Sequence, residues 1–237
     1  MAKILVLVEG AKTDVRLIKH LLSVYEIDSK YEVVSYNTNI YTLYKEMFYD
    51  GKPQEKDTLQ VLKQHEQDKE KKLIFEQEYT DILLVFDVDT QDNLFTSDKI
   101  FTMMNYFIES TDMGRLYLNY PMVEAFYHMS SIPDHAYNDR IVTMNELLED
   151  TYKTRVNREN RNRDYSKFAV TREECNTVIK QNINKGNCII NAGLENTLPD
   201  TSLILNVQLK MLDELQKMYV LCTCVFFIPE YSRHLLK

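Results

Sequence analysis

Apolar and polar residues follow two different rhythms along the first half of the chain. Short apolar-rich runs, typical of buried strands, occur at residues 4–8, 31–36, 82–86 and 115–120. Between them, apolar residues recur every three to four positions, which predicts amphipathic helices over 13–25, 39–49 and 100–107. Pro121 favours a further helix over 121–128, because a proline in the first turn loses no hydrogen bond. This alternation predicts an α/β fold with an open, mostly parallel sheet flanked by helices.

The pattern changes twice along the chain. Residues 54–78 are dominated by Lys, Glu, Gln and Asp, which predicts a charged, exposed helical insertion. Past residue 135 the spacing predicts helices over 144–148, 171–184 and 202–218, whereas the apolar segment 219–228 fits a strand or a buried helix. We therefore expect a core over residues 1–135, followed by a mainly helical region over 136–237 that packs on it.

Composition narrows the class of protein. The chain has 237 residues, 44% of them hydrophobic, and its five Gly and five Pro argue against a turn-rich all-β fold. Its four cysteines show neither zinc-site spacing nor a disulfide framework, so we expect reduced thiols in the core. The first residues do not form a signal peptide, and no apolar run reaches the roughly 20 residues of a membrane span. These features predict a cytoplasmic protein.

The strongest candidate for chemistry is a pair of aspartates behind a buried strand. Residues 82–86 are apolar and lead into Asp87 and Asp89, which would share one face of a continuing strand. Two adjacent carboxylates repel each other unless a cation lies between them, and Mg²⁺ prefers such oxygen ligands. The alternative is that these acidic residues simply end the strand and cap the next helix.

Two further acidic positions support the metal interpretation. Glu9 follows the strand at 4–8, and Glu124 follows the strand at 115–120. In open α/β sheets ligands bind beyond the carboxyl ends of the strands. The sequence therefore predicts that Glu9, Glu124 and the aspartate pair meet at one edge of the sheet.

These motifs resemble the TOPRIM domain of topoisomerases, bacterial primases, ribosomal-RNA maturases and OLD-family nucleases. Val8-Glu9-Gly10 closes one strand and Asp87-Val88-Asp89 closes a later one, as in that domain. The turn over residues 9–14, EGAKTD, is similar to the EGxKTE turn of stand-alone RloB-like defence proteins. The segment 119–126, NYPMVEAF, resembles their NPxxExW/F segment. The chain departs from the pattern at Tyr120, which separates Asn from Pro, and at Asp14, where Glu is commoner.

The resemblance covers residues 3–130 and implies a function. It implies a Mg²⁺- or Mn²⁺-dependent nuclease, a toxic effector of a bacterial anti-phage system, acting on RNA or DNA. Asp87 and Asp89 would be metal ligands, and Glu9 a ligand or a general acid or base. Glu124 would supply a further ligand or hold Lys12, and Lys12 would contact the scissile phosphate or be an ordinary surface lysine. The family habit also suggests a partner ATPase, and it leaves a homodimer open.

A basic segment lies in the C-terminal region. Lysines and arginines outnumber acidic residues by four over 153–167, and Tyr152 and Tyr165 flank or interrupt them. A basic strip with aromatic residues can bind a nucleic-acid backbone and stack on its bases, although a solvated loop explains the charges equally well. The proposed contacts are Lys153, Arg155, Arg158, Arg161 and Arg163. We expect His128 and His135 to be ordinary packed or surface residues rather than catalytic ones.

Two other functions remain open from the sequence. One is a non-catalytic TOPRIM-fold assembly subunit with a residual acidic cluster. The other is a phosphatase of the haloacid dehalogenase type, whose DxDx[TV] motif resembles Asp87-Val88-Asp89-Thr90. Gln91 in the fifth position, and an internal rather than a first strand, argue against the phosphatase.

Overall fold

The computed structural model describes residues 3–193 and 197–236. The predicted fold class is confirmed, because the chain is an α/β protein with a mostly parallel sheet flanked by helices. It forms two compact units, residues 1–86 with 98–117 and residues 87–97 with 118–237. These units interleave along the chain, whereas the sequence suggested consecutive parts over 1–135 and 136–237. The difference arises because the residues that follow two of the strands pack with the C-terminal region.

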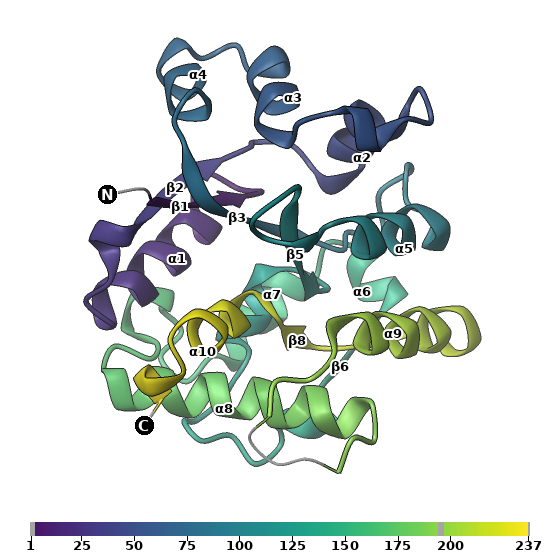
Figure 1. Ribbon diagram of the computed structural model, residues 1–237. Coiled ribbons are helices and arrows are strands. Elements are labelled where there is room, and N and C mark those ends of the chain that lie inside the picture. Colours follow the sequence, from purple (N-terminus) through teal and green to yellow (C-terminus); the bar gives the residue numbers. More distant parts are fainter. Residues whose placement is uncertain (1–2, 194–196, 237) are drawn as a thin grey trace. The chain divides into compact units, whose positions relative to one another are not determined.

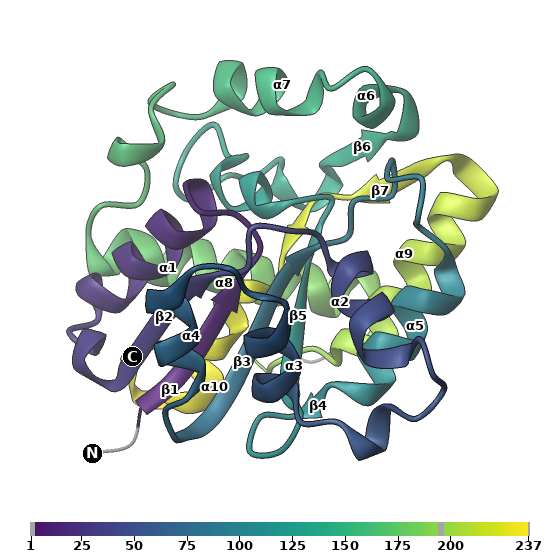
Figure 2. The same cartoon turned by 90° about the horizontal axis from the view of Figure 1, so that it is seen from above.

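The sheet is built from strands in the order β2-β1-β3-β5-β4. These are β1 (Lys3–Val8), β2 (Tyr31–Ser35), β3 (Tyr79–Asp87), β4 (Ile108–Glu109) and β5 (Gly114–Tyr120). Figure 2 shows β1, β3 and β5 running through the sheet. β1 pairs in parallel with β2 and β3, with Val6 opposite Val33 and Leu83. The central strands are buried on both faces, which is why they read as continuous apolar runs.

Three of the five helices described in the first unit start at a side-chain cap. The five are α1 (Thr13–Val24), α2 (Ile40–Phe48), α3 (Thr58–His65), α4 (Lys69–Phe75) and α5 (Ser97–Tyr106). The side chains of Asn39, Asp57 and Asp68 accept backbone N–H groups at the starts of α2, α3 and α4. The charged insertion is helical as predicted, and α3 packs against α4 (Figure 1). Val61 and Phe75 are buried, so the insertion is anchored by apolar contacts.

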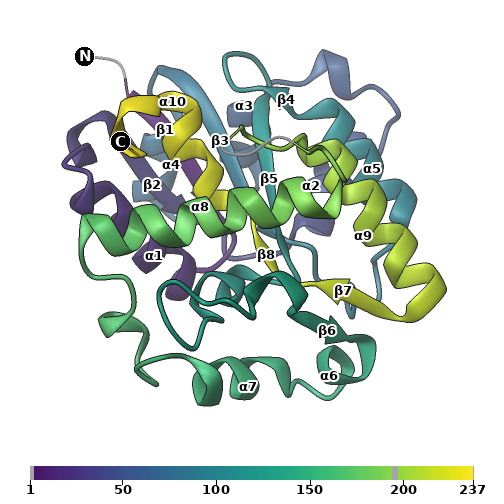
Figure 3. The ribbon, with the colours of Figure 1, turned by 90° about the horizontal axis from the view of Figure 1, so that it is seen from below.

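The second unit is mainly helical. It contains α6 (Met144–Leu148), α7 (Tyr152–Glu159), α8 (Arg172–Ile189), α9 (Thr201–Leu215) and α10 (Phe227–Tyr231). Three short strands complete it: β6 (Ile141–Thr143), β7 (Lys217–Tyr219) and β8 (Leu221–Cys222). β6 pairs with β7, and β8 pairs antiparallel with the end of β5, with Cys222 opposite Asn119. Figure 3 shows the long helix α8, which contacts α9.

Two local predictions differ from the structure. The residues after Pro121 form a 3-10 helix, η3 (Val123–Tyr127), rather than an α-helix starting at the proline. Met122 is extended, and the Val88 N–H donates to the carbonyl oxygens of both Asn119 and Pro121, which holds this segment to the strand end. Segment 219–228 is neither wholly strand nor wholly helix, because it contains β8 and the start of α10.

Two predictions, about the cysteines and about membrane spans, can also be compared with the structure. Cys175, Cys222 and Cys224 are buried free thiols, as expected, whereas Cys188 is exposed on α8. Within the described residues, no helix has both the length and the apolar character that crossing a membrane requires.

Candidate acidic site at the end of strand β3

Strand β3 ends at Asp87, whose carboxylate contacts a buried polar side chain. Ile82–Phe86 fill the core, and Asp87 is itself 9% exposed. The Asp87 Oδ1 accepts a hydrogen bond of 3.2 Å from the Nδ2 of Asn119, a fully buried side chain on β5. Asn119 thereby fixes the Asp87 carboxylate, while its own Oδ1 accepts the Cys224 N–H at 3.3 Å.

Asp89 lies beyond the strand in a left-handed conformation. β3 ends at Asp87, and Asp89 has φ +40°, so the prediction that both side chains share a face of one strand is wrong. The reversal has a local cause, because the Asp92 N–H donates to the Asp89 carbonyl oxygen and Gln91 Nε2 donates to its carboxylate at 2.9 Å. A non-glycine residue in this region carries backbone strain, and such strain concentrates at functional sites.

Among the predicted acidic site residues outside strand β3, Glu124 is the most deeply buried. It belongs to η3 and is 6% exposed. Burial raises the pKa of Glu124, Lys153 lowers it, and the charges of Asp89 and Asp150 raise it further. The net direction is upward, and burial is its largest cause.

Lys153 supplies the positive charge that these acids share. Its Nζ lies 4.0 Å from Glu124 Oε1. Partial burial lowers the pKa of Lys153, but the carboxylates of Glu124, Asp87, Asp150 and Asp89 together raise it above its usual value. Four carboxylates therefore act on one ammonium group. We call Asp87, Asp89, Glu124, Asp150 and Lys153 the strand-end cluster.

Glu9 and Lys12 belong to the first unit. Glu9 directly follows β1, its backbone N–H donates to the Val85 carbonyl oxygen at 3.1 Å, and its side chain is partly buried. Lys12 is exposed at the start of α1. Gly10 between them has a steric reason, because a Cβ there would lie 2.6 Å from Oδ2 of the buried Asp14. The EG turn is thus shaped around the Asp14 carboxylate.

The predicted basic strip is largely engaged in ion pairs within the second unit. Arg155 contacts Glu146 at 2.9 Å and Glu159 at 3.3 Å, Arg158 contacts Glu159 at 3.2 Å, and Arg161 contacts Glu174 at 2.8 Å. Glu146 and Glu174 are the capping-box residues of α6 and α8, so Arg155 and Arg161 stabilise the starts of these two helices. Arg163 is exposed, with φ +51°.

The aromatic residues of that strip also have internal partners. Tyr152 is fully buried, so it does not present a ring for stacking on bases, contrary to the prediction. The ring of Tyr165 stacks on Tyr127, with centroids 4.1 Å apart. His128 is a packed residue as expected, fully buried beside Tyr152, and His135 is exposed.

The donor set of the strand-end cluster suits a hard cation. Carboxylate oxygens are the ligands that Mg²⁺ and Mn²⁺ prefer. Within residues 3–193 and 197–236, however, no three His, Cys, Asp or Glu side chains are grouped as a ready metal centre. A bound Mg²⁺ therefore stays a prediction.

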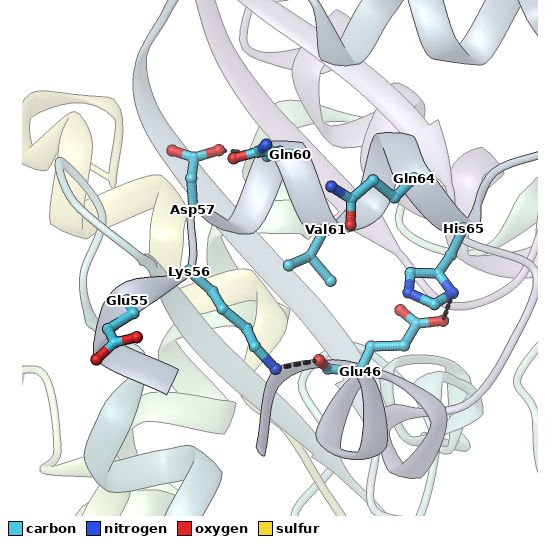
Figure 4. Close-up of a pocket in the computed structure, with 8 residues that line it drawn as sticks. All are labelled: Glu46, Glu55, Lys56, Asp57, Gln60, Val61, Gln64 and His65. Carbon is cyan, nitrogen blue, oxygen red and sulfur yellow. Dashed lines mark hydrogen bonds and ion pairs between the residues drawn. The ribbon is translucent and has the colours of Figure 1, made fainter. Parts of the chain in front are cut away.

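A second acidic feature lies in the first unit (Figure 4). A cleft of about 370 Å³ is lined by residues of α2, of α3 and of the turn between them. Its acidic residues, Glu46, Glu55 and Asp57, come with Lys56 and His65, and we call it the insertion cleft. Glu46 accepts a hydrogen bond from Tyr36, and its Oε1 lies 3.3 Å from His65 Nδ1. Asp57 caps α3, and Glu55 pairs with Lys52 at 3.1 Å.

Sequence reasoning missed three contributors to the strand-end cluster. Asn119 was noted only as part of a motif, Asp150 was not singled out, and Lys153 was assigned to the basic strip.

Comparison of the chain with protein-family models, with curated proteins and with solved structures finds no match in any of the three. The TOPRIM resemblance therefore stands on the quoted motifs alone.

Proposed function

We propose that this chain is a metal-dependent nuclease of the TOPRIM type, which cleaves phosphodiester bonds in RNA or DNA. The observation that carries the proposal is the strand-end cluster, in which the carboxylates of Asp87, Asp89 and Glu124 all act on the ammonium group of Lys153. Carboxylates gathered at the carboxyl end of a sheet strand are an arrangement that can take a divalent cation and a phosphate.

The residues take distinct roles in this proposal. Asp87, Asp89 and Glu124 would hold Mg²⁺ or Mn²⁺, which when bound neutralises phosphate charge and lowers the pKa of an attacking water. Asn119 would keep the Asp87 carboxylate oriented toward the metal ion through the 3.2 Å hydrogen bond. Lys153, whose pKa is raised, would stay protonated and pair with a non-bridging phosphate oxygen. The motif resemblance adds Glu9 as an acid or base and Lys12 as a phosphate contact.

The test is a cleavage assay on tRNA, single-stranded DNA and duplex DNA with Mg²⁺, Mn²⁺ or EDTA. Wild type is compared with Asp87→Asn, which keeps the shape of the side chain but removes its charge. Glu149→Gln is the matched control, because Glu149 is an exposed acid beside the cluster. We expect metal-dependent cleavage that only Asp87→Asn abolishes. Equal cleavage by all three proteins, or cleavage in EDTA, would contradict the proposal, and a folded wild type without cleavage would favour an assembly subunit.

The defence role is proposed on the motif resemblance alone. We propose a toxic effector that acts in the bacterial cytoplasm and is restrained or delivered by a partner ATPase. Expression in a bacterial host should arrest growth with wild type but not with Asp87→Asn or Glu9→Gln at equal protein levels. Arrest by all three proteins would contradict an effector that works through cleavage.

A further inference from the structure

His128 joins the two ends of helix α7. Its ring is fully buried, with Nδ1 3.2 Å from the Tyr152 hydroxyl and Nε2 3.0 Å from Glu159 Oε2. Tyr152 and Glu159 are the first and last residues of α7, seven positions apart, which places them two turns apart on one face. One side chain thus spans the whole helix.

The chemistry of the partners fixes how the ring is protonated. The Glu159 carboxylate also receives Arg140 at 3.0 Å and Arg155 at 3.3 Å. Burial raises the pKa of Glu159, but hydrogen bonding to His128 and the charge of Arg155 lower it to about 2. An ionised carboxylate only accepts, so Nε2 carries the proton, and Nδ1 of the neutral ring accepts from the Tyr152 hydroxyl.

Further bonds tie α7 to the segment that carries Glu124. Asn160 Nδ2 donates to the Tyr127 carbonyl oxygen at 2.8 Å, and the Arg161 N–H donates to that of Met129 at 2.9 Å. Tyr127 is the last residue of η3, the turn that contains Glu124. Tyr152 is covalently next to Lys153. The histidine therefore links the backbone that presents Glu124 to the backbone that presents Lys153.

We infer that His128 is a positioning residue, which acts through Tyr152 to hold Lys153 beside the Glu124 carboxylate, 4.0 Å from its Nζ. The inference concerns the placement of Lys153, and it rests on the proposed function only in treating this cluster as the reaction site. A purely structural histidine would support folding without any particular effect on Lys153. The two roles differ in what they predict for the Lys153 amine.

The first experiment measures the chemistry of that amine without any substrate. Competitive acylation, read by mass spectrometry, reports the deprotonated fraction of Lys153 in the full chain. In Tyr152→Phe the ring remains but the hydroxyl is lost, so we expect Lys153 to move away from Glu124 and to acylate about threefold faster at fixed pH, because it loses the carboxylate that favours its charged form. Asn157→Ala, an exposed change on the same helix, is the control and should acylate like wild type.

His128→Gln should accelerate the acylation further, provided that circular dichroism shows a folded protein. If it does not fold, Tyr152→Phe alone decides the question. Unchanged acylation in a folded Tyr152→Phe protein overturns the inference.

The second experiment is a double-mutant cycle on cleavage. We expect Tyr152→Phe to lower kcat about tenfold in wild type but to cost nothing further in Lys153→Ala, because the two residues act as a unit. Additive losses would show that Tyr152 and His128 act independently of Lys153 and would overturn the inference. If wild type does not cleave at all, the proposed nuclease function fails, while the acylation result still decides whether His128 positions Lys153.

Discussion

The strand-end cluster and the insertion cleft are both acidic, yet they differ in the electrostatic interactions of their charged side chains. In the insertion cleft Lys56 donates to the Glu46 carbonyl oxygen (Figure 4), and it also forms an ion pair with Asp50. In the strand-end cluster four carboxylates act on the single ammonium group of Lys153, and Glu124 is buried with a raised pKa. A count of acidic residues does not separate the two. The raised pKa of Glu124 and the joint action of four carboxylates on Lys153 do.

The largest expected effect is on cleavage. Glu124→Gln should lower kcat/KM at least about 100-fold, because a lost metal ligand removes several kcal/mol of transition-state stabilisation. Glu46→Gln in the insertion cleft should leave kcat/KM within about twofold of wild type. Initial rates on the preferred substrate measure both. A loss of similar size in both variants would remove the distinction between the two features.

The next effect is on acid stability and concerns the histidines of the two regions. Burial is the main cause that lowers the pKa of His128 to about 4; Arg140 and Arg155 lower it as well, whereas Glu159 raises it. Between this value and the unfolded value of 6.5 the unfolded chain binds a proton that the folded chain does not. Stability is therefore complete above pH 6.5 and falls by about 3 kcal/mol as the pH drops to 4. Urea unfolding at several pH values should show this slope.

The slope should disappear in His128→Gln and persist in His65→Gln, which alters the insertion cleft. Glu159 contributes in a separate window, because its pKa of about 2 affects stability only below pH 4.5. A slope that both variants retain would assign the acid sensitivity to other groups.

A smaller effect should come from divalent cations. At Mg²⁺ a hundredfold above its dissociation constant, binding to the folded state adds about 2.7 kcal/mol, which raises Tm by several degrees. Thermal unfolding should show this rise in wild type and in Asp57→Asn but not in Asp87→Asn. Stabilisation that Asp57→Asn loses and Asp87→Asn keeps would place the cation in the insertion cleft.

The smallest expected effect is purely structural. Asp57 accepts the Gln60 N–H at 2.7 Å and begins α3, so Asp57→Ala should cost about 1 kcal/mol of unfolding free energy. Cleavage measured well below Tm should not change. Reduced cleavage by the folded variant would give the insertion cleft a catalytic role.

The comparison also shows where sequence reasoning succeeds. Strand β3 and the carboxylates behind it follow from a local pattern, because an apolar run of this length buries itself wherever the sheet lies. Helices α3 and α4 follow from their caps and spacing in the same way. These features depend on neighbours within a few residues, and the chain displays them directly.

The partners of charged side chains could not be predicted in this way. Lys153 and Arg155 look alike in a basic stretch, but Lys153 faces the strand-end cluster and Arg155 braces the start of α6. The partners of Lys153 lie up to 66 positions away along the chain, and the packing of α7 selects them. The partner of the Tyr152 hydroxyl, His128, likewise comes from a different segment.

The backbone at Asp89 has a consequence for how this sequence tolerates change. Glycine adopts a φ of +40° with less strain than aspartate does, so backbone conformation alone favours glycine at this position. Asp89→Gly should therefore fold about as stably as wild type while losing the carboxylate that acts on Glu124 and Lys153. Selection for stability alone would let this aspartate drift to glycine, whereas selection for chemistry would retain it. The strained aspartate thus marks a trade-off between stability and activity at a single position.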